Sequence, residues 1–196
     1  MSRVVHPIEQ LSYQILRERV DLSQLPPLTR AVTERVVHAS ADLDYVTDLV
    51  CDEAALAAGL EALRGGAPLV TDVAMVAAGI TGRAAVCPVA EPAVAELARS
   101  AGITRSAAAI RIAYDRVGPG AVWAVGCAPT ALTELIGLDA EPALVVGLPV
   151  GFVGAAEAKA ALRVSGLPAV SNRSEKGGSA VAAAAVNALL YTSEQP

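Results

Sequence analysis

The sequence is poor in aromatic residues and cysteine, and it lacks long hydrophobic runs. Aromatic residues make up 3% of the 196 residues, which argues against a stacking platform for single-stranded nucleic acid. The three cysteines, Cys51, Cys87 and Cys127, form no CxxC pair, so neither a disulfide framework nor a zinc site is indicated. No uncharged stretch is long enough to span a membrane, and no apolar signal-peptide core follows the first residues. We therefore expect a cytoplasmic protein with reduced thiols and no membrane partner.

The formal net charge is −5, so the chain as a whole does not attract nucleic acid. An anionic ligand would have to be held by local arginines against this overall charge. Several arginines lie close to glycine-rich turns, namely Arg83, Arg105, Arg111, Arg116 and Arg173.

Short apolar runs alternate with alanine-rich segments from about residue 48 onward. We expect strands at 48–51, 68–71, 84–89, 121–125, 143–146 and 168–170. We expect helices at 53–63, 73–78, 92–101, 103–114, 129–136, 155–164 and 179–190, preceded by two N-terminal helices from Pro7 to about Val20 and from Thr29 to about His38. The strands are apolar throughout, which is typical of a parallel sheet covered on both faces. The pattern predicts a three-layer α/β/α sandwich with a mostly parallel, doubly wound, flavodoxin-like sheet. It forms one domain over 1–196, with N-terminal helices at about 7–38 and an α/β core at about 45–191.

Ligands of such sheets bind beyond the carboxyl ends of the strands. Asp72 follows the strand expected at 68–71 and is a candidate there, although a helix cap for 73–78 is an equally good interpretation. The segment "SNRSEKGGS" places Lys176, Gly177, Gly178 and Ser179 at the start of the last helix, where free amides and a cation would receive a carboxylate or phosphate. Ordinary turn glycines with a serine cap explain the same residues. Neither a dinucleotide-binding GxGxxG nor a P-loop is present.

Histidine is scarce as well. His6 precedes Pro7, and His38 ends an apolar helix with Asp42 and Asp44 close behind. Most histidines at such positions are structural, but one near two carboxylates is a candidate acid–base group. A Cys–His hydrolase using Cys87 or Cys127 is a weaker alternative, because neither cysteine lies in a recognisable nucleophile turn.

Seven motifs taken in order resemble the precorrin-8X methylmutase family of corrin-ring (cobalamin) biosynthesis. They are "HPIEQLSYQIL", "ERVVHASADLDY", "GAPLVTDVAMVAAGI", "TRSAAAIRIA", "VGCAPTALTEL", "GLPVGFVGAAEAK" and "SNRSEKGGSAVAAAAVNALL", and they extend over residues 6–190 without a large insertion.

The resemblance implies an isomerase that catalyses a 1,5-sigmatropic methyl shift. The reaction converts precorrin-8X to hydrogenobyrinate, or cobalt-precorrin-8 to cobyrinate, with no cofactor, metal or external methyl donor. It implies His38 as the catalytic residue, Ser12 and Arg111 as substrate contacts, and a homodimer in which both subunits contribute to each active site. The substrate carries many acidic side chains, which would give Arg83, Arg105, Arg173 and the turn Lys176–Ser179 a role in binding them, and Asp72 is a further candidate substrate contact.

Three hypotheses remain at this point. In the first, a histidine protonates a ring nitrogen and takes the proton back, which withdraws electron density and lowers the barrier to methyl migration. The second is a non-catalytic corrinoid carrier of the same fold. The third is a Cys–His amidohydrolase acting on corrin side chains.

Overall fold

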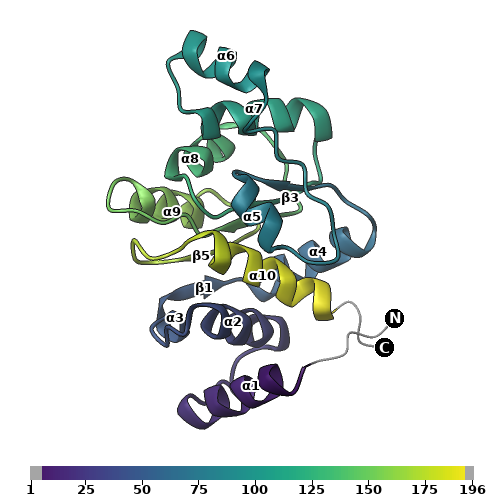
Figure 1. Ribbon diagram of the computed structural model, residues 1–196, viewed down its shortest axis with the longest axis vertical. Coiled ribbons are helices and arrows are strands. Elements are labelled where there is room, and N and C mark those ends of the chain that lie inside the picture. Colours follow the sequence, from purple (N-terminus) through teal and green to yellow (C-terminus); the bar gives the residue numbers. More distant parts are fainter. Residues whose placement is uncertain (1–5, 193–196) are drawn as a thin grey trace.

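The computed structural model describes residues 6–192 and contains a five-stranded sheet in the order β1-β5-β4-β3-β2. Strands β2 to β5 are parallel, and β1 pairs with β5 in the antiparallel direction. The mostly parallel sandwich predicted from the sequence is confirmed (Figure 1). The strands are β1 (Leu49–Cys51), β2 (Leu69–Thr71), β3 (Val122–Val125), β4 (Leu144–Gly147) and β5 (Ala169–Asn172).

The prediction of a strand at 84–89 is wrong. In this segment only Val86 forms a β-bridge, which is parallel and pairs with Val70. Val86 N donates to Leu69 O at 2.7 Å, and Thr71 N donates to Val86 O at 3.0 Å. Pro88 follows closely and has no N–H to continue the ladder. The chain thus passes from β2 outward to Val86 and then back across β2 to β3. This reversal makes the β2–β3 boundary the switch point of a flavodoxin-like order.

The expected helices are present with small shifts at their ends. The second helix begins at Pro27 rather than Thr29, because proline suits the first turn and the Glu53 carboxylate accepts from the free amides of Leu28 and Thr29 at 2.9 and 2.8 Å. One short helix, α3, was not predicted. The helices are α1 (Pro7–Arg19), α2 (Pro27–Ser40), α3 (Tyr45–Asp48), α4 (Glu53–Arg64), α5 (Ala74–Gly79), α6 (Pro92–Ala101), α7 (Arg105–Val117), α8 (Pro129–Gly137), α9 (Ala155–Val164) and α10 (Ser179–Thr192).

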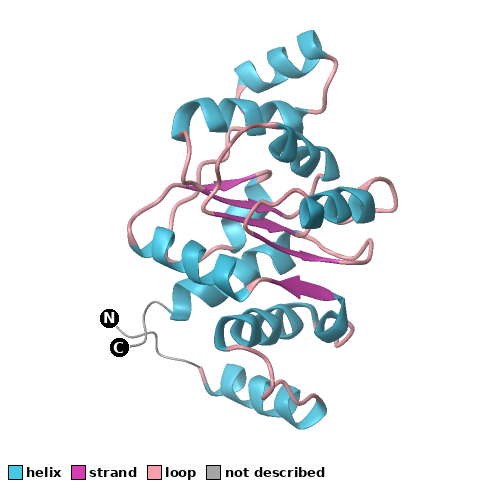
Figure 2. Ribbon diagram, turned by 180° about the vertical axis from the view of Figure 1, so that it is seen from behind, coloured by secondary structure: helices cyan, strands magenta, loops and turns pink. Residues whose placement is uncertain are grey.

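Helices cover both faces of the sheet (Figure 2). Helices α7, α8 and α9 bury one face around Trp123 and Val145, and α6 packs on the outside of α7. Helices α4 and α10 bury the other face around Ala124 and Val146, and α2 packs on α10. Helix α1 packs on α2 and projects from the lower end of the molecule (Figure 1). Within residues 6–192, no helix combines the length and the apolar character that crossing a membrane requires.

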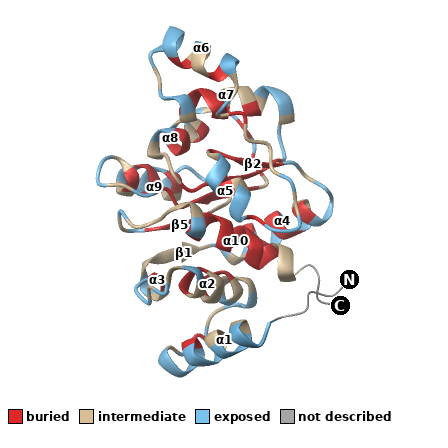
Figure 3. Ribbon diagram, in the orientation of Figure 1, coloured by how far each residue is buried: buried red, intermediate tan, exposed pale blue. Residues whose placement is uncertain are grey.

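Helix α10 is buried on every side from Val181 to Leu189 (Figure 3). This is possible because five of the nine side chains in this stretch are single methyl groups, which let neighbouring backbones approach closely. Gly126 follows β3 and faces this helix: a Cβ added there would lie 2.7 Å from Ala182 Cβ and 2.8 Å from Val76 Cγ2. The small residues of both segments therefore set the distance between helix and sheet.

We predict that Gly126→Ala lowers the free energy of unfolding by about 1–3 kcal/mol, because the new methyl group overpacks this contact. Gly137→Ala is the matched control, since a Cβ at Gly137 meets nothing within 4 Å and alanine favours the helical conformation. Urea unfolding of both variants tests this, and equal stabilities would contradict it.

Candidate functional site

The structure brings Ser12 and His38 together although 26 positions separate them. Helix α1 crosses α2 so that Ser12 Oγ lies 2.8 Å from His38 Nδ1. His38 occupies the last turn of α2, which ends where Ala41 adopts a left-handed φ of 54°. The free carbonyl ends of a helix favour a positive charge close by. The position therefore suits a side chain that can carry a positive charge.

Tyr13 and Arg35 complete the surroundings of His38. The Tyr13 ring stacks on the imidazole with 4.7 Å between ring centroids and 13° between the planes. Arg35 Nη1 donates to Tyr13 Oη at 3.0 Å and to Glu9 Oε1 at 2.5 Å. Tyr13, Arg35 and Glu9 were not among the site residues predicted from the sequence. The signal available for Arg35 was its spacing, one helical turn before His38 on the same face of α2.

A surface pocket of about 400 Å³ opens beside these side chains. It is a concave site that combines a titratable imidazole with a hydroxyl and an arginine, as binding sites often do. Its lining consists of His6, Ile8, Glu9, Ser12, Arg35 and His38.

Arg111 lies in a second pocket, of about 580 Å³, between α7 and α8. Its guanidinium makes a bidentate ion pair with Glu134, with Nε 2.5 Å from Oε1 and Nη2 3.1 Å from Oε2. The hydroxyls of Thr104 and Thr130, 2.7 Å apart, belong to the same pocket. Helices α7 and α8 lie at the upper end of the molecule and α1 and α2 at the lower end (Figures 1 and 2). Within one chain, Arg111 and His38 therefore do not share a pocket.

Asp72 follows β2 at the switch point, where it is fully buried. Its carboxylate accepts from the backbone amides of Gly126, Cys127 and Ala128 at 3.0, 2.9 and 2.8 Å. Burial raises its pKa, and these three hydrogen bonds act in the opposite direction. The interpretation of Asp72 as a cap for the helix at 73–78 was wrong, because its carboxylate instead accepts hydrogen bonds from the loop that leads into α8. A direct contact between Asp72 and substrate stays a prediction.

The other arginines predicted to bind substrate differ in the hydrogen bonds that they make within the protein. Arg83 donates to the main-chain oxygens of Leu63 and Ala67, and Arg173 Nη1 donates to Thr47 O. Arg105 is exposed at the start of α7. Their substrate contacts are not tested by this geometry.

Lys176 turns toward the N-terminal helices. Its Nζ lies 2.8 Å from Asp42 Oδ2 and 2.5 Å from Asp44 Oδ2, and these hydrogen bonds raise its pKa. Gly177 passes close to β4, where an added Cβ would lie 2.4 Å from Leu148 O. Gly178 N donates to the same oxygen at 2.9 Å, just before Ser179 begins α10. The turn thus links the sheet to the segment after His38, and its role in anion binding stays a prediction.

A buried polar network anchors this turn. Lys159, fully buried, donates to Asn172 Oδ1 at 2.8 Å and to Lys176 O at 2.5 Å, and burial lowers its pKa to about 8. Asp48 accepts from Asn172 Nδ2 and Ser174 Oγ, both at 2.7 Å, and from Ser174 N at 2.8 Å. The end of β5 is therefore fixed to α3 by a carboxylate with several donors.

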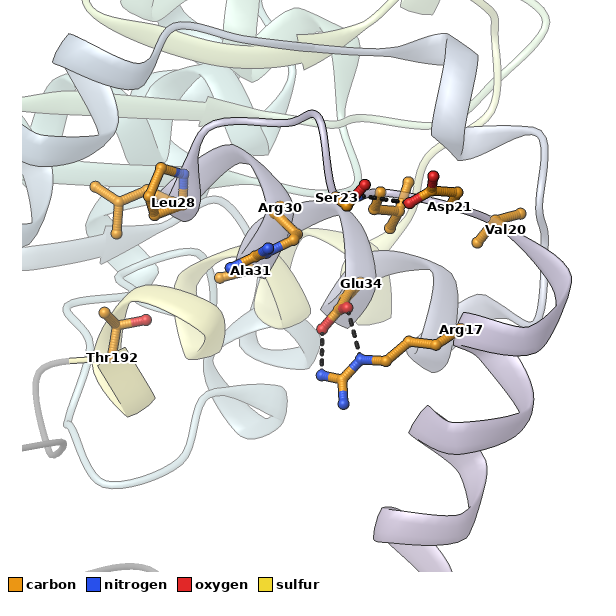
Figure 4. A pocket seen from close by; sticks show the side chains of 11 residues that line it. Arg17, Val20, Asp21, Ser23, Leu28, Arg30, Ala31, Glu34 and Thr192 are labelled. Carbon is orange, nitrogen blue, oxygen red and sulfur yellow. Dashed lines mark hydrogen bonds and ion pairs between the residues drawn. The ribbon is translucent and has the colours of Figure 1, made fainter.

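The largest of the described pockets, about 600 Å³, lies between the end of α1 and the start of α2 (Figure 4). Arg17 points toward Glu34 there and forms a bidentate pair with it, at 2.9 Å for both hydrogen bonds. The charge of Arg17 is thus balanced within the protein.

Cys51 and Cys127 do not resemble activated nucleophiles. Burial raises the pKa of Cys51 to about 12, and burial followed by the nearby Asp72 charge raises that of Cys127. A thiolate is therefore disfavoured at both, which argues against a Cys–His hydrolase that uses Cys127. Across residues 6–192, no three His, Cys, Asp or Glu side chains lie together as a metal-binding group.

The fold and site define a flavodoxin-like α/β protein in which a serine holds a histidine beside a surface pocket. The profile of the precorrin-8X methylmutase family matches residues 7–192. The chain belongs to this family, whose members are isomerases that carry out the methyl shift of cobalamin biosynthesis.

Individual relatives agree with this assignment. The chain is 41% identical over 195 residues to a cobalt-precorrin-8 methylmutase from Methanothermobacter thermautotrophicus, covering 96% of this chain and 94% of that one. It is 42% identical over 199 residues to a precorrin-8X methylmutase from Pseudomonas aeruginosa, covering 95% of each. A solved precorrin-8X methylmutase structure from Thermus thermophilus superimposes with a TM-score of 0.86 at 35% identity, covering 95% of both chains.

We predict that Asp48→Asn lowers the free energy of unfolding by about 1.5–3 kcal/mol at pH 7, because the amide cannot accept all the hydrogen bonds of the carboxylate. Burial alone would raise the pKa of Asp48, yet the bonds from Ser174 and Asn172 hold it below its usual value. Stability from this group is thus present above about pH 4 and is lost as the pH falls through the folded-state pKa. Urea unfolding at several pH values should show the wild-type advantage shrinking below about pH 4.

The matched control is Asp44→Asn, because the Asp44 side chain is 76% exposed and Asp42 binds the same lysine. We expect it to cost at most about 1 kcal/mol. If Asp44→Asn lowered the free energy of unfolding as much as Asp48→Asn, the buried hydrogen bonds of Asp48 would stabilise the fold no more than an exposed ion pair does.

Proposed function

We propose that this chain is a cytoplasmic enzyme that binds precorrin-8X or cobalt-precorrin-8 and catalyses the 1,5-sigmatropic methyl shift to hydrogenobyrinate or cobyrinate. The observation that carries this is the Ser12–His38 pair at the wall of a pocket, in a member of the methylmutase family. The methyl group migrates between neighbouring ring carbons, so substrate and product have the same composition. The reaction needs a proton donor that recovers its proton.

His38 can do this with its two ring nitrogens in separate roles. Ser12 Oγ lies 2.8 Å from Nδ1, and in this proposal Nε2 is the nitrogen that exchanges a proton with the substrate. When Nε2 gives its proton to a nitrogen of the corrin ring, the imidazole becomes neutral and keeps the proton on Nδ1. That N–H then donates a hydrogen bond to Ser12 Oγ. Electron density then moves toward the protonated nitrogen, the methyl group migrates, and Nε2 takes the proton back.

The substrate contact of Arg111 requires a second subunit. Helix α7, which carries Arg111, and helix α2, which carries His38, lie at opposite ends of one chain (Figure 1), so we propose a homodimer in which His38 of one subunit and Arg111 of its partner face the same corrinoid. An exposed row on α1 supports this arrangement, because no other described element covers it and its first residue lines the His38 pocket. The row consists of Ile8, Leu11 and Ile15, with exposed fractions of 72%, 54% and 42%. Arg111 would bind a substrate carboxylate with the N–H groups that Glu134 does not occupy.

The reaction itself is tested by incubating the protein with each substrate form and following the visible spectrum and the mass. A changed spectrum at unchanged mass supports the isomerase. A spectrum that stays that of bound substrate would identify a carrier, and ammonia release with a change in mass would identify an amidohydrolase.

We predict that His38→Ala lowers turnover by about a hundred- to ten-thousand-fold, because general acid catalysis is lost. Corrinoid affinity should change little, as judged by equilibrium titration of the bound spectrum. His6→Ala is the control, since His6 lines the same pocket and its Nδ1 accepts from Ile8 N at 3.2 Å. Near wild-type turnover of His38→Ala would eliminate it as the proton donor.

We predict that mixing His38→Ala and Arg111→Ala subunits restores activity. If each site takes His38 from one chain and Arg111 from the other, every mixed dimer holds one intact site, so random exchange returns roughly a quarter of wild-type activity. The assay uses substrate well below KM, where the affinity lost in Arg111→Ala is visible. A mixture that stays inactive after proven subunit exchange would contradict the shared site.

A further inference from the structure

Tyr13 makes a contact with His38 that the proton-transfer scheme above leaves without a role. The phenol ring lies flat against the imidazole, with 4.7 Å between centroids and planes within 13°. Tyr13 follows Ser12 directly in α1, so one helix supplies both the hydrogen bond to Nδ1 and the stacked ring. The hydrogen bond holds one atom of the imidazole, whereas stacking holds its plane.

The Tyr13 ring is itself held in place. Its hydroxyl accepts from Arg35 Nη1 at 3.0 Å, and Arg35 is in turn bound by Glu9 and lies 4.8 Å from the centroid of the Tyr191 ring. The Arg35 and Glu9 side chains are each only 16% exposed, so this ion pair is shielded from water more than a surface pair would be. Burial also raises the pKa of Tyr13, which keeps the phenol neutral around the stack.

We propose that Tyr13 is a positioning residue for His38: its ring fixes the imidazole plane in the orientation in which Nδ1 meets Ser12 and the imidazole exchanges a proton with the corrinoid. A flat aromatic face also attracts the positively charged form of the imidazole. The stack thus stabilises the proton-bearing state of His38 in the orientation that proton transfer needs. This inference rests on the proposed function, in which His38 is the proton donor.

The test compares Tyr13→Phe with Tyr13→Leu. Phenylalanine keeps the ring and loses only the hydroxyl that meets Arg35, whereas leucine removes the ring. We expect Tyr13→Leu to lower kcat by about 10- to 100-fold with KM within about twofold, because a misplaced catalytic group slows the reaction without weakening binding. Tyr13→Phe should keep kcat within about threefold of wild type, which is the rescue that a purely hydrogen-bonding role would not give.

Nuclear magnetic resonance of the His38 ring protons gives a readout independent of turnover. The stacked phenol ring shifts these protons upfield, and we expect the shift to be kept in Tyr13→Phe and lost in Tyr13→Leu. Circular dichroism and urea unfolding check that both variants fold, and Tyr13→Met replaces the leucine variant if that one does not.

The possible results separate this inference from the proposed function. Wild-type kcat in Tyr13→Leu, while His38→Ala is inactive, would overturn the role of Tyr13 and leave His38 as proton donor. Equal losses of kcat in the Phe and Leu variants would also overturn it, since the contact with Arg35 would then be the one that matters. If the wild type converts no substrate, the proposed function fails, and unshifted His38 protons in wild type would refute the stack separately.

Discussion

The close approach of α10 to its neighbours is the constraint on which the rest of the structure depends. Alanine methyl groups let this helix contact the sheet on one side and α2 on the other, so burial extends around its whole circumference from Val181 to Leu189. Larger side chains would push α2 away from the sheet. Because α2 carries His38, the packing of α10 determines where the histidine lies relative to the sheet.

Polar contacts complement this packing at the carboxyl ends of the strands. In many doubly wound proteins these ends form the ligand crevice, and here several of their charged side chains bind internal partners. Asp72 binds three backbone amides beyond β3, and Asp48 and Lys159 fasten the end of β5. A buried charge is tolerated only when such partners are present. These charges therefore hold loops, and the pocket beside His38 is built from the added helices α1 and α2.

Each chain consequently has two separate pockets. One has the histidine and its serine, and the other has Arg111 with two threonine hydroxyls. In the proposed function, a large macrocycle with acidic side chains needs a proton donor, and it also needs protein groups that bind its carboxylates. A dimer that brings opposite ends of two chains together would supply both and would cover the apolar row of α1.

The sequence by itself determined the alternation of strands and helices, because apolar runs and proline at helix starts act locally. Pro7, Pro92 and Pro129 each begin a helix where the pattern placed one. The motifs also predicted His38 as the catalytic residue and Ser12 as a substrate contact, and the structure places the two side chains 2.8 Å apart. The edge segment around Val86 was overpredicted, because apolar character alone does not show whether a neighbouring strand can complete the hydrogen bonds.

Only the tertiary structure decided which partner each charged side chain takes. Lys176 has the sequence setting of an anion site, yet it lies against Asp42 and Asp44, more than 130 positions earlier in the chain. Asp72 likewise binds a loop beyond β3 instead of the helix that follows it. The stack of Tyr13 on His38 arises from the crossing of two helices, which no local pattern encodes. Electrostatic and aromatic contacts depend on distances in space, and folding sets those distances through packing among segments remote in sequence.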